Sequence, residues 1–174
     1  MTPLLLAFGG REPKLADSVF VANGACVIGE VVVGENSSIW FNSVVRGDVN
    51  WIRIGERTNI QDNSVLHVTH GLHPLSVGSD VTIGHRSILH GCTIEDGCLI
   101  GMGAIVLDGA RVRKNAMVAA GSLVLAGFEV PEGVLVAGVP ASIKRPLTVA
   151  EREGLWQSAK HYVEYAKSYH STNY

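Results

Sequence analysis

The sequence predicts an all-β fold, a left-handed parallel β-helix of six-residue repeats, followed by a C-terminal α-helix. Three observations carry this prediction. Hexads run without a gap from Ile94 to Leu123, glycine or asparagine fills the fourth place of each, and the spacing of apolar residues becomes helical after Pro146. We therefore expect residues 1–147 to form the β-helix and residues 148–174 to form a helix packed on it.

The hexads are IEDGCL, IGMGAI, VLDGAR, VRKNAM and VAAGSL, and three of their columns have one chemistry each. The first column is branched and apolar: Ile94, Ile100, Val106, Val112 and Val118. The fourth holds residue types that tolerate positive φ: Gly97, Gly103, Gly109, Asn115 and Gly121. The fifth is small: Cys98, Ala104, Ala110, Ala116 and Ser122. Short strands ending in left-handed corners would stack the branched column inside a triangular coil, whereas a β-sandwich with irregular turns would not produce three matched columns.

Looser hexads precede this run, and the pattern has two irregularities. It breaks between Val68 and Val81, where Gly71, Pro74 and Gly78 predict a loop that protrudes near residues 69–80. The second irregularity lies within GHRSILHGC, because Ile83 and Ile94 are eleven residues apart instead of twelve. Histidines lie beside both irregularities.

The tail after Pro146 predicts a helix. Thr148-Val149-Ala150-Glu151 has the form of a capping box, in which threonine and glutamate bond each other's backbone amides. Apolar residues then recur at helical spacing, and this amphipathic face predicts packing along the outside of the coil. These residues are Leu155, Ala159, Tyr162, Val163 and Ala166.

Composition excludes two classes of partner. The formal net charge of -2 offers no positive field for nucleic acid, so we expect no nucleic-acid partner. The longest apolar run near the start, Leu4–Phe8, is too short to cross a bilayer, so we also expect no membrane partner. An odd set of three dispersed cysteines suits a reducing compartment, and we expect a cytoplasmic location. Cys92 and Cys98 fall at successive corners, where they are expected to be small buried fillers.

Three histidines lie within β-helix segments: His67, His85 and His90. Along an extended chain a five-residue step points in opposite directions, so His85 and His90 should not reach one point within a single chain. They could share a metal if different subunits supplied them, and zinc in catalytic sites accepts three neutral imidazoles and keeps a position for water. Spacing alone leaves open that all three are polar surface residues.

The sequence motifs around these histidines resemble those of a known protein family. VVRGDVN, IGERTNIQDNSVLHVTH and VTIGHRSILHGC, followed by IGMGAIVLDGA, closely resemble the gamma-class carbonic anhydrase family of bacterial hexapeptide-repeat proteins. The resemblance implies that His67, His85 and His90 bind zinc. It further implies that His67 and His90 come from one chain and His85 from its neighbour. The expected assembly is a homotrimer with its sites at subunit interfaces and carbon dioxide or bicarbonate as substrate. Iron or cobalt could replace zinc.

The resemblance also suggests six residues with catalytic or positioning roles. Arg46 and Asp48 match an Arg-Gly-Asp step that forms an interface ion pair in the family. The alternative is a surface salt bridge that contributes little to stability, which the same residues would also form. Gln61 matches a glutamine near the metal-bound hydroxide and Asp62 the acid after it, while ordinary turn chemistry is the alternative for both.

Asn59 is a further candidate in the same block, and Tyr162 matches a tyrosine that approaches the site. An aromatic residue on a helix face is more often a packing residue, which is the alternative for Tyr162.

The chain departs from the family in its proton relay. Well-understood members have a glutamate directly after the Arg-x-Asp step and an acidic loop between the first two histidines. This chain has Val49 at the first place, and its loop from Thr69 to Ser79 contains no acid. His70 and His73 are candidates to substitute, because an unperturbed histidine pKa suits proton transfer near neutral pH.

Other functions of the same fold remain open. One is a coenzyme A-dependent acyltransferase, which uses a single histidine as base and needs no metal, and a related one is a zinc-assisted thioesterase. Another is a metal-binding trimer without catalysis. Chelator sensitivity, coenzyme A binding and turnover on each substrate class would separate these readings.

Overall fold

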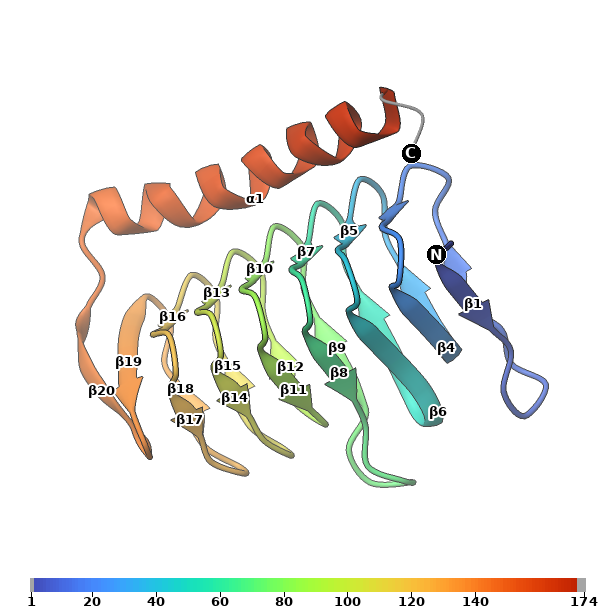
Figure 1. Cartoon of the computed structure of the whole chain (residues 1–174). Coiled ribbons are helices and arrows are strands. Elements are labelled where there is room, and N and C mark those ends of the chain that lie inside the picture. The colour runs from blue at the N-terminus through green and yellow to red at the C-terminus, as the bar shows by residue number, and fades with distance from the viewer. Residues whose placement is uncertain (1, 172–174) are drawn as a thin grey trace.

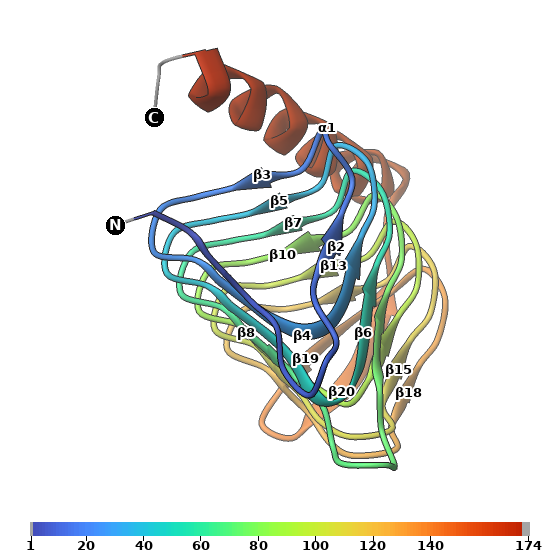
Figure 2. The same ribbon diagram turned by 90° about the vertical axis from the view of Figure 1, so that its right-hand side faces the viewer.

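The computed structural model describes residues 2–171, in which short strands wind into a triangular coil and one helix lies along its outside (Figures 1 and 2). Strands of successive coils pair in parallel and in register, so the coil has three flat faces. This arrangement confirms the predicted left-handed parallel β-helix. Residues 1 and 172–174, which the two expected ranges include, lie outside the described part of the chain.

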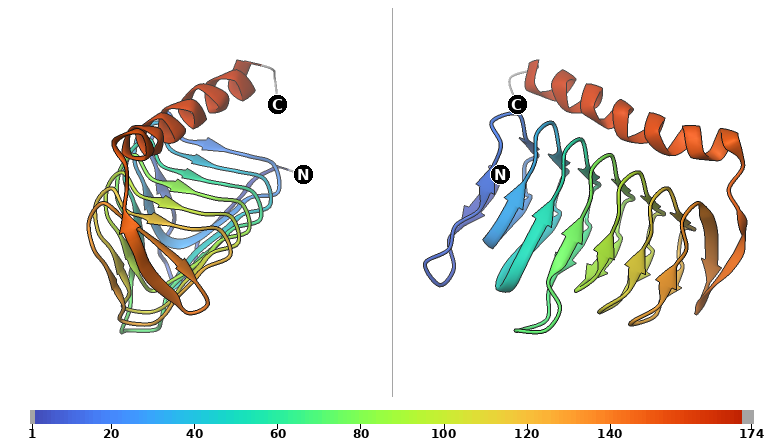
Figure 3. Two further views of the ribbon diagram at one scale, coloured as in Figure 1. Left: turned by 90° about the vertical axis from the view of Figure 1, so that its left-hand side faces the viewer. Right: turned by 180° about the vertical axis from the view of Figure 1, so that it is seen from behind.

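The first face carries α1 (Val149–Ser171), which contacts its N-terminal strands (Figure 3). Its strands are β3 (Phe20–Val21), β5 (Ser38–Ile39), β7 (Asn59–Ile60), β10 (Thr82–Ile83), β13 (Leu99–Ile100), β16 (Met117–Val118) and β19 (Val134–Gly138), with antiparallel β20 (Ala141–Pro146) at the end.

The second face holds β1 (Leu4–Leu6), the first part of β4 (Cys26–Val33) and of β6 (Val44–Ile54), then β8 (Val65–His67), β11 (Ile88–His90), β14 (Ile105–Val106) and β17 (Leu123–Val124). The third face holds β2 (Lys14–Leu15), the last part of β4 and β6, then β9 (Leu75–Val77), β12 (Thr93–Ile94), β15 (Arg111–Val112) and β18 (Glu129–Val130).

The predicted columns fill the interior and the corners. The branched column from Ile94 to Val118 is buried, with exposures of 0–1%. Each of its members lies over the residue one coil earlier, as Ile100 lies over Ile83. The fourth-column residues have positive φ, for example 67° at Gly97 and 55° at Asn115. Burial of branched side chains in continuous rows supplies the main stabilising free energy of such a fold, at about 25 cal/mol per Å² of apolar surface.

Both irregularities are located. The expected loop over 69–80 is narrower in the structure, because Leu75–Val77 returns to the third face as β9 and Val68 is buried in the core, so only residues 69–74 leave the coil. The eleven-residue step falls between Leu89, which pairs with Leu66, and Ile94, which pairs with Val77. The corner between them turns at Gly91, with a φ of 51°.

The helix begins as the capping box predicts. Glu151 donates its backbone N–H to the Thr148 hydroxyl at 3.2 Å, and the Thr148 amide donates to the Glu151 carboxylate at 2.9 Å. Tyr162 packs edge-on against Trp40 of the first face, with ring centroids 5.3 Å apart. Among the described residues, α1 is too polar to cross a membrane, and no other helix is present.

Candidate metal centre

His67 and His90 form a pair at the corner between the second and third faces. Strands β8 and β11 lie side by side in parallel register, which places His90 directly over His67. The Nδ1 atom of His67 and the Nε2 atom of His90 face each other at 3.1 Å. Two imidazoles from separate coils therefore present nitrogen atoms to one point, which we call the His67/His90 half-site.

Each imidazole of this half-site holds a carboxylate with its other nitrogen. His67 Nε2 lies 3.1 Å from Asp48, and His90 Nδ1 lies 2.6 Å from Asp108. Asp48 also accepts a hydrogen bond from Arg46 at 2.6 Å, and Asp108 accepts one from the Thr69 hydroxyl at 2.7 Å. Such carboxylates fix the tautomer and the ring orientation of metal-binding histidines.

The electrostatics favour a neutral His67 between ionised acids. Burial lowers the pKa of His67 by opposing its cationic form, and the Asp48 hydrogen bond only partly offsets this. Burial also opposes ionisation of Asp48 and Asp108, but the hydrogen bonds that they accept outweigh it and hold the pKa of each carboxyl below its usual range. Neutral imidazole is the form that binds a metal.

His85 lies at a different corner, between the first and second faces, close to the predicted residues Asn59, Gln61, Asp62 and Tyr162, whereas Arg46 and Asp48 lie at the His67/His90 half-site. Its Nδ1 atom is 2.7 Å from the Asp62 carboxylate. His85, Gln61 and Tyr162 line a groove of about 410 Å³ between this corner and α1, and we call this group with Asp62 the His85 half-site. Burial, and then the charge of Asp62, raises the pKa of Tyr162.

Gln61 is held in one orientation by a chain of hydrogen bonds. Its Nε2 donates to Asn59 Oδ1 at 3.1 Å, and Asn59 Nδ2 donates to the Thr82 hydroxyl at 3.0 Å. Both amide side chains are buried, which sterically and electrostatically fixes them more firmly than ordinary turn residues. The side-chain oxygen Oε1 of Gln61 is thereby left to accept a hydrogen bond from a donor in the groove, while its backbone carbonyl accepts one from the Ser43 hydroxyl.

The structure does not bring the two half-sites together within one chain. Among the described residues, no group of three or more His, Cys, Asp or Glu side chains is placed to hold a metal. The half-sites lie at opposite edges of the second face. This face is apolar outward, where Val65, Ile88, Ile105 and Leu123 stand in one register column. Val65 and Ile88 are each 38% exposed.

Asp108 was not identified from the sequence. It follows His90 by 18 residues, which is three hexads, or one full coil of the unbroken repeat. Counting coils forward from His90 was therefore the signal that could have found it. Thr69, which also binds Asp108, lies inside the irregular loop, where no such count applies.

The donor set fits zinc. Two nitrogens bound to one tetrahedral zinc at about 2.0–2.1 Å would be roughly 3.3 Å apart, and the facing nitrogens of His67 and His90 are 3.1 Å apart. The third imidazole, His85, also has a carboxylate on one nitrogen. All three histidines thus have the carboxylate partner that zinc ligands commonly have, and each keeps a second nitrogen for the metal.

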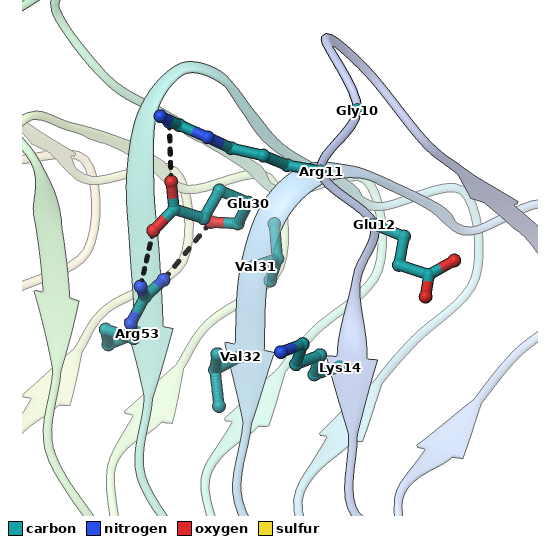
Figure 4. Close-up of a pocket in the computed structure, with 8 residues that line it drawn as sticks. All are labelled: Gly10, Arg11, Glu12, Lys14, Glu30, Val31, Val32 and Arg53. Atoms are coloured by element: carbon teal, nitrogen blue, oxygen red, sulfur yellow. Dashed lines mark hydrogen bonds and ion pairs between the residues drawn. The ribbon is translucent and has the colours of Figure 1, made fainter.

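A larger cavity lies elsewhere and lacks this chemistry. It has a volume of about 540 Å³ and lies beside the N-terminal strands, where Arg11, Glu30 and Arg53 line it (Figure 4). Both guanidinium groups contact the one Glu30 carboxylate at 2.6 Å, so their charges are partly compensated. No histidine lines this cavity, and we place the functional site at the two half-sites instead.

Comparison with known proteins agrees with this fold and these motifs. Residues 91–126 match the family model described as bacterial transferase hexapeptide (six repeats). The chain is 42% identical over 166 residues to a carbonic anhydrase from Geobacillus kaustophilus, an alignment that covers 95% of this chain and 91% of that protein.

Two further comparisons give the wider range. The mitochondrial gamma carbonic anhydrase 2 of Arabidopsis thaliana is 46% identical over 168 residues, covering 94% of this chain, which spans only 60% of that longer protein. A solved Bacillus cereus structure, provisionally described as an acetyltransferase, superimposes with a TM-score of 0.96 at 42% identity and covers 99% of both chains. These relatives, together with the paired histidines, show that the chain belongs to the gamma-class carbonic anhydrase family of hexapeptide-repeat proteins.

Proposed function

We propose that this protein hydrates carbon dioxide reversibly as a zinc-dependent homotrimer. His67 and His90 of one subunit and His85 of the next would together hold each zinc ion. The observation that supports this most directly is the His67/His90 pair, with facing nitrogens 3.1 Å apart and a carboxylate behind each ring. Two ligands in one chain, with a third at the opposite edge of an apolar face, is the arrangement that a shared site requires.

The apolar second face supports the proposed trimer. A threefold axis beside this face would bring the His67/His90 half-site of each subunit against the His85 half-site of its neighbour. The outward residues of the third face are polar by contrast, for example Arg53, Arg111 and Glu129. Contact through the second face would bury Val65 and Ile88, which otherwise remain exposed.

Zinc held by three neutral imidazoles lowers the pKa of a water ligand to about 7 and so supplies hydroxide at neutral pH. The protein's own groups do the rest. Gln61 would orient the attacking hydroxyl or the substrate in the groove, its side-chain oxygen accepting a hydrogen bond from the hydroxyl. Asp62 and Asp48 hold two of the imidazoles in place, and Arg46 balances the charge of Asp48. The Tyr162 ring lines one side of the groove.

A proton must leave this site in each turnover. His73 is better placed than His70 to carry it, because His70 is exposed, whereas His73 is half-buried against Gly91 and Gly109 beside the half-site. Val49 offers no proton acceptor. We therefore propose His73 as the relay, and a cytoplasmic location in which the three free cysteines remain thiols.

Stopped-flow carbon dioxide hydration by metal-quantified protein tests the proposal, beside a His85→Ala variant. Hydration that requires His85, with zinc bound stoichiometrically, is the expected result. Iron- and cobalt-loaded samples in the same assay would identify the effective metal. Metal bound without hydration would contradict the proposal.

A second candidate is thioester chemistry, as a coenzyme A-dependent acyltransferase or a zinc-assisted thioesterase. The observation that favours it is the groove at His85, which at about 410 Å³ is far larger than carbon dioxide requires and is lined by Met102 and Met117. Acyl transfer by metal-free protein, or chelator-sensitive thioester cleavage, would establish it in place of hydration. A full metal complement with no turnover on either substrate class would instead indicate a binding trimer.

A further inference from the structure

The loop 69–74 is short, rigidly braced and apolar at its tip. Leu72 is 72% exposed there. The Thr69 amide donates to His73 O at 3.0 Å, which closes the loop, and the Thr69 hydroxyl donates to Asp108 at 2.7 Å. Asn50 donates to Thr69 O at 3.2 Å from the coil below. The loop protrudes from the corner that carries the His67/His90 half-site (Figure 1), and its leucine is exposed to solvent.

The loop leans along the stack of coils. The loop leaves the coil after β8, yet the His73 ring lies over Gly109. The Cε1 atom of His73 is 3.4 Å from the position that a Cβ at Gly109 would take. Gly109 belongs to the coil made by β13, β14 and β15, two coils beyond the coil that contains β8. The same coil of every subunit carries Met102, between β13 and β14.

Met102 lies in the groove of the His85 half-site and is 59% exposed. Beside it the groove presents the apolar side chains of Met117 and Ala119. Within the described part of the chain nothing covers Met102, and a groove of this character takes an apolar partner.

Rotation about an axis parallel to the stack keeps every residue at its height. If His85 of one subunit joins His67 and His90 of the next, the groove beside His85 faces the loop of that next subunit. Met102 of the groove then lies in the same layer of the stack as Gly109, which the His73 ring of the loop reaches. We propose that Leu72 packs on the partner subunit's Met102 and closes the groove over the shared site. This inference rests on the proposed function, because it requires the site to be shared between subunits.

The contact would decide which substrates reach the site. With Leu72 seated, the outer part of the groove is filled and the inner part, beside Gln61 and His85, stays open to a small molecule. Removal of the leucine would reopen the groove to longer apolar chains. The absence of acids from this loop fits the same role, because a carboxylate against Met102 would lose its hydration without gaining a partner.

A cross-linking experiment tests the contact. In a Cys26→Ser background, Leu72→Cys and Met102→Cys are combined, and the protein is oxidised or treated with a short bismaleimide. Cys92 and Cys98 are buried and do not interfere. The expected products on a non-reducing gel are covalent dimers and trimers, which the single-cysteine variants do not form. A trimer by light scattering that yields no such products would overturn the inference and leave the proposed function standing, whereas a monomer would overturn both.

A matched pair of charge substitutions gives a second test. Leu72→Asp should raise the concentration at which the trimer dissociates by roughly 30-fold or more, because burial of one leucine is lost at each of the three interfaces. Val149→Asp is the control, since Val149 is 69% exposed at the start of α1, outside both half-sites and the loop. Equal dissociation of the two variants would overturn the inference.

Discussion

Replacement of Asp108 by asparagine isolates the role of a carboxylate that binds no metal itself. Asp108 accepts hydrogen bonds from His90 at 2.6 Å and from Thr69 at 2.7 Å, and both are short enough to be charge-assisted. Asparagine keeps the shape of the corner and removes the charge. Loss of such a partner commonly weakens metal affinity about 10–100-fold. We therefore expect Asp108→Asn to raise the zinc dissociation constant by that factor, or by about 1.4–2.8 kcal/mol.

Competition with a chromogenic chelator measures this change, and Asp96→Asn is the matched control. Asp96 precedes Gly97 as Asp108 precedes Gly109, but its carboxylate contacts Lys114 at 3.3 Å on the surface. An exposed pair of this kind contributes at most about 1 kcal/mol, and it is remote from the histidines. Zinc affinity should be unchanged in Asp96→Asn. Affinity within twofold of the parent in Asp108→Asn would refute the reasoning.

The same structure leads to three further predictions. Gly91→Ala should lower both stability and zinc affinity, because its Cβ would lie 2.3 Å from Asp108 Oδ1 and 2.7 Å from His73 Cβ. Gly103→Ala, whose Cβ would have no atom within 4 Å, should lower only the thermal midpoint. Equal zinc affinities of the two variants would count against this geometry. Ile100→Ala should destabilise the protein by about 2–5 kcal/mol in denaturant titrations, and the 46% exposed Leu125→Ala by much less; a mild effect at Ile100 would contradict tight interior stacking. Arg145 and the Thr148 cap lower the pKa of Glu151 to about 2. The stabilising effect of the Glu151 carboxylate is therefore present above the usual pKa of glutamate and lost as pH falls towards 2. The difference in thermal midpoint between Glu151→Gln and the parent should narrow over that range, and a constant difference would be inconsistent with this ion pair.

Most of the fold was predictable because each coil repeats the same local solution. Any single hexad shows a branched interior residue, a corner residue with positive φ and a small residue directly after that corner. The branched column from Ile94 to Val118 is buried as expected. The return of Leu75–Val77 to the third face was not predicted, because the loop before it removes the phase of the repeat.

The candidate site was only partly predictable, for a related reason. His67 and His90 lie 23 residues apart, whereas His90 and Asp108 lie 18 apart, as one regular coil requires. The five extra residues come from the loop, which hides the alignment of the two histidines from any fixed count. The resemblance to a family supplied that pairing, and the parallel register of β8 and β11 gives its structural basis. The opposite placement of His85 follows from the five-residue step to His90.

The most direct test of a site shared between subunits is complementation between two inactive variants. His67→Ala and His85→Ala proteins are unfolded together, refolded as a mixture in the presence of zinc, freed of loosely bound metal and assayed for zinc content and carbon dioxide hydration, beside each variant refolded alone. Each mixed trimer would contain about one site with all three histidines intact, as the symmetry of a ring requires. Our account predicts that activity and tightly bound zinc reappear in the mixture and in neither variant alone. A mixture of trimers that stays as inactive as its components would contradict it.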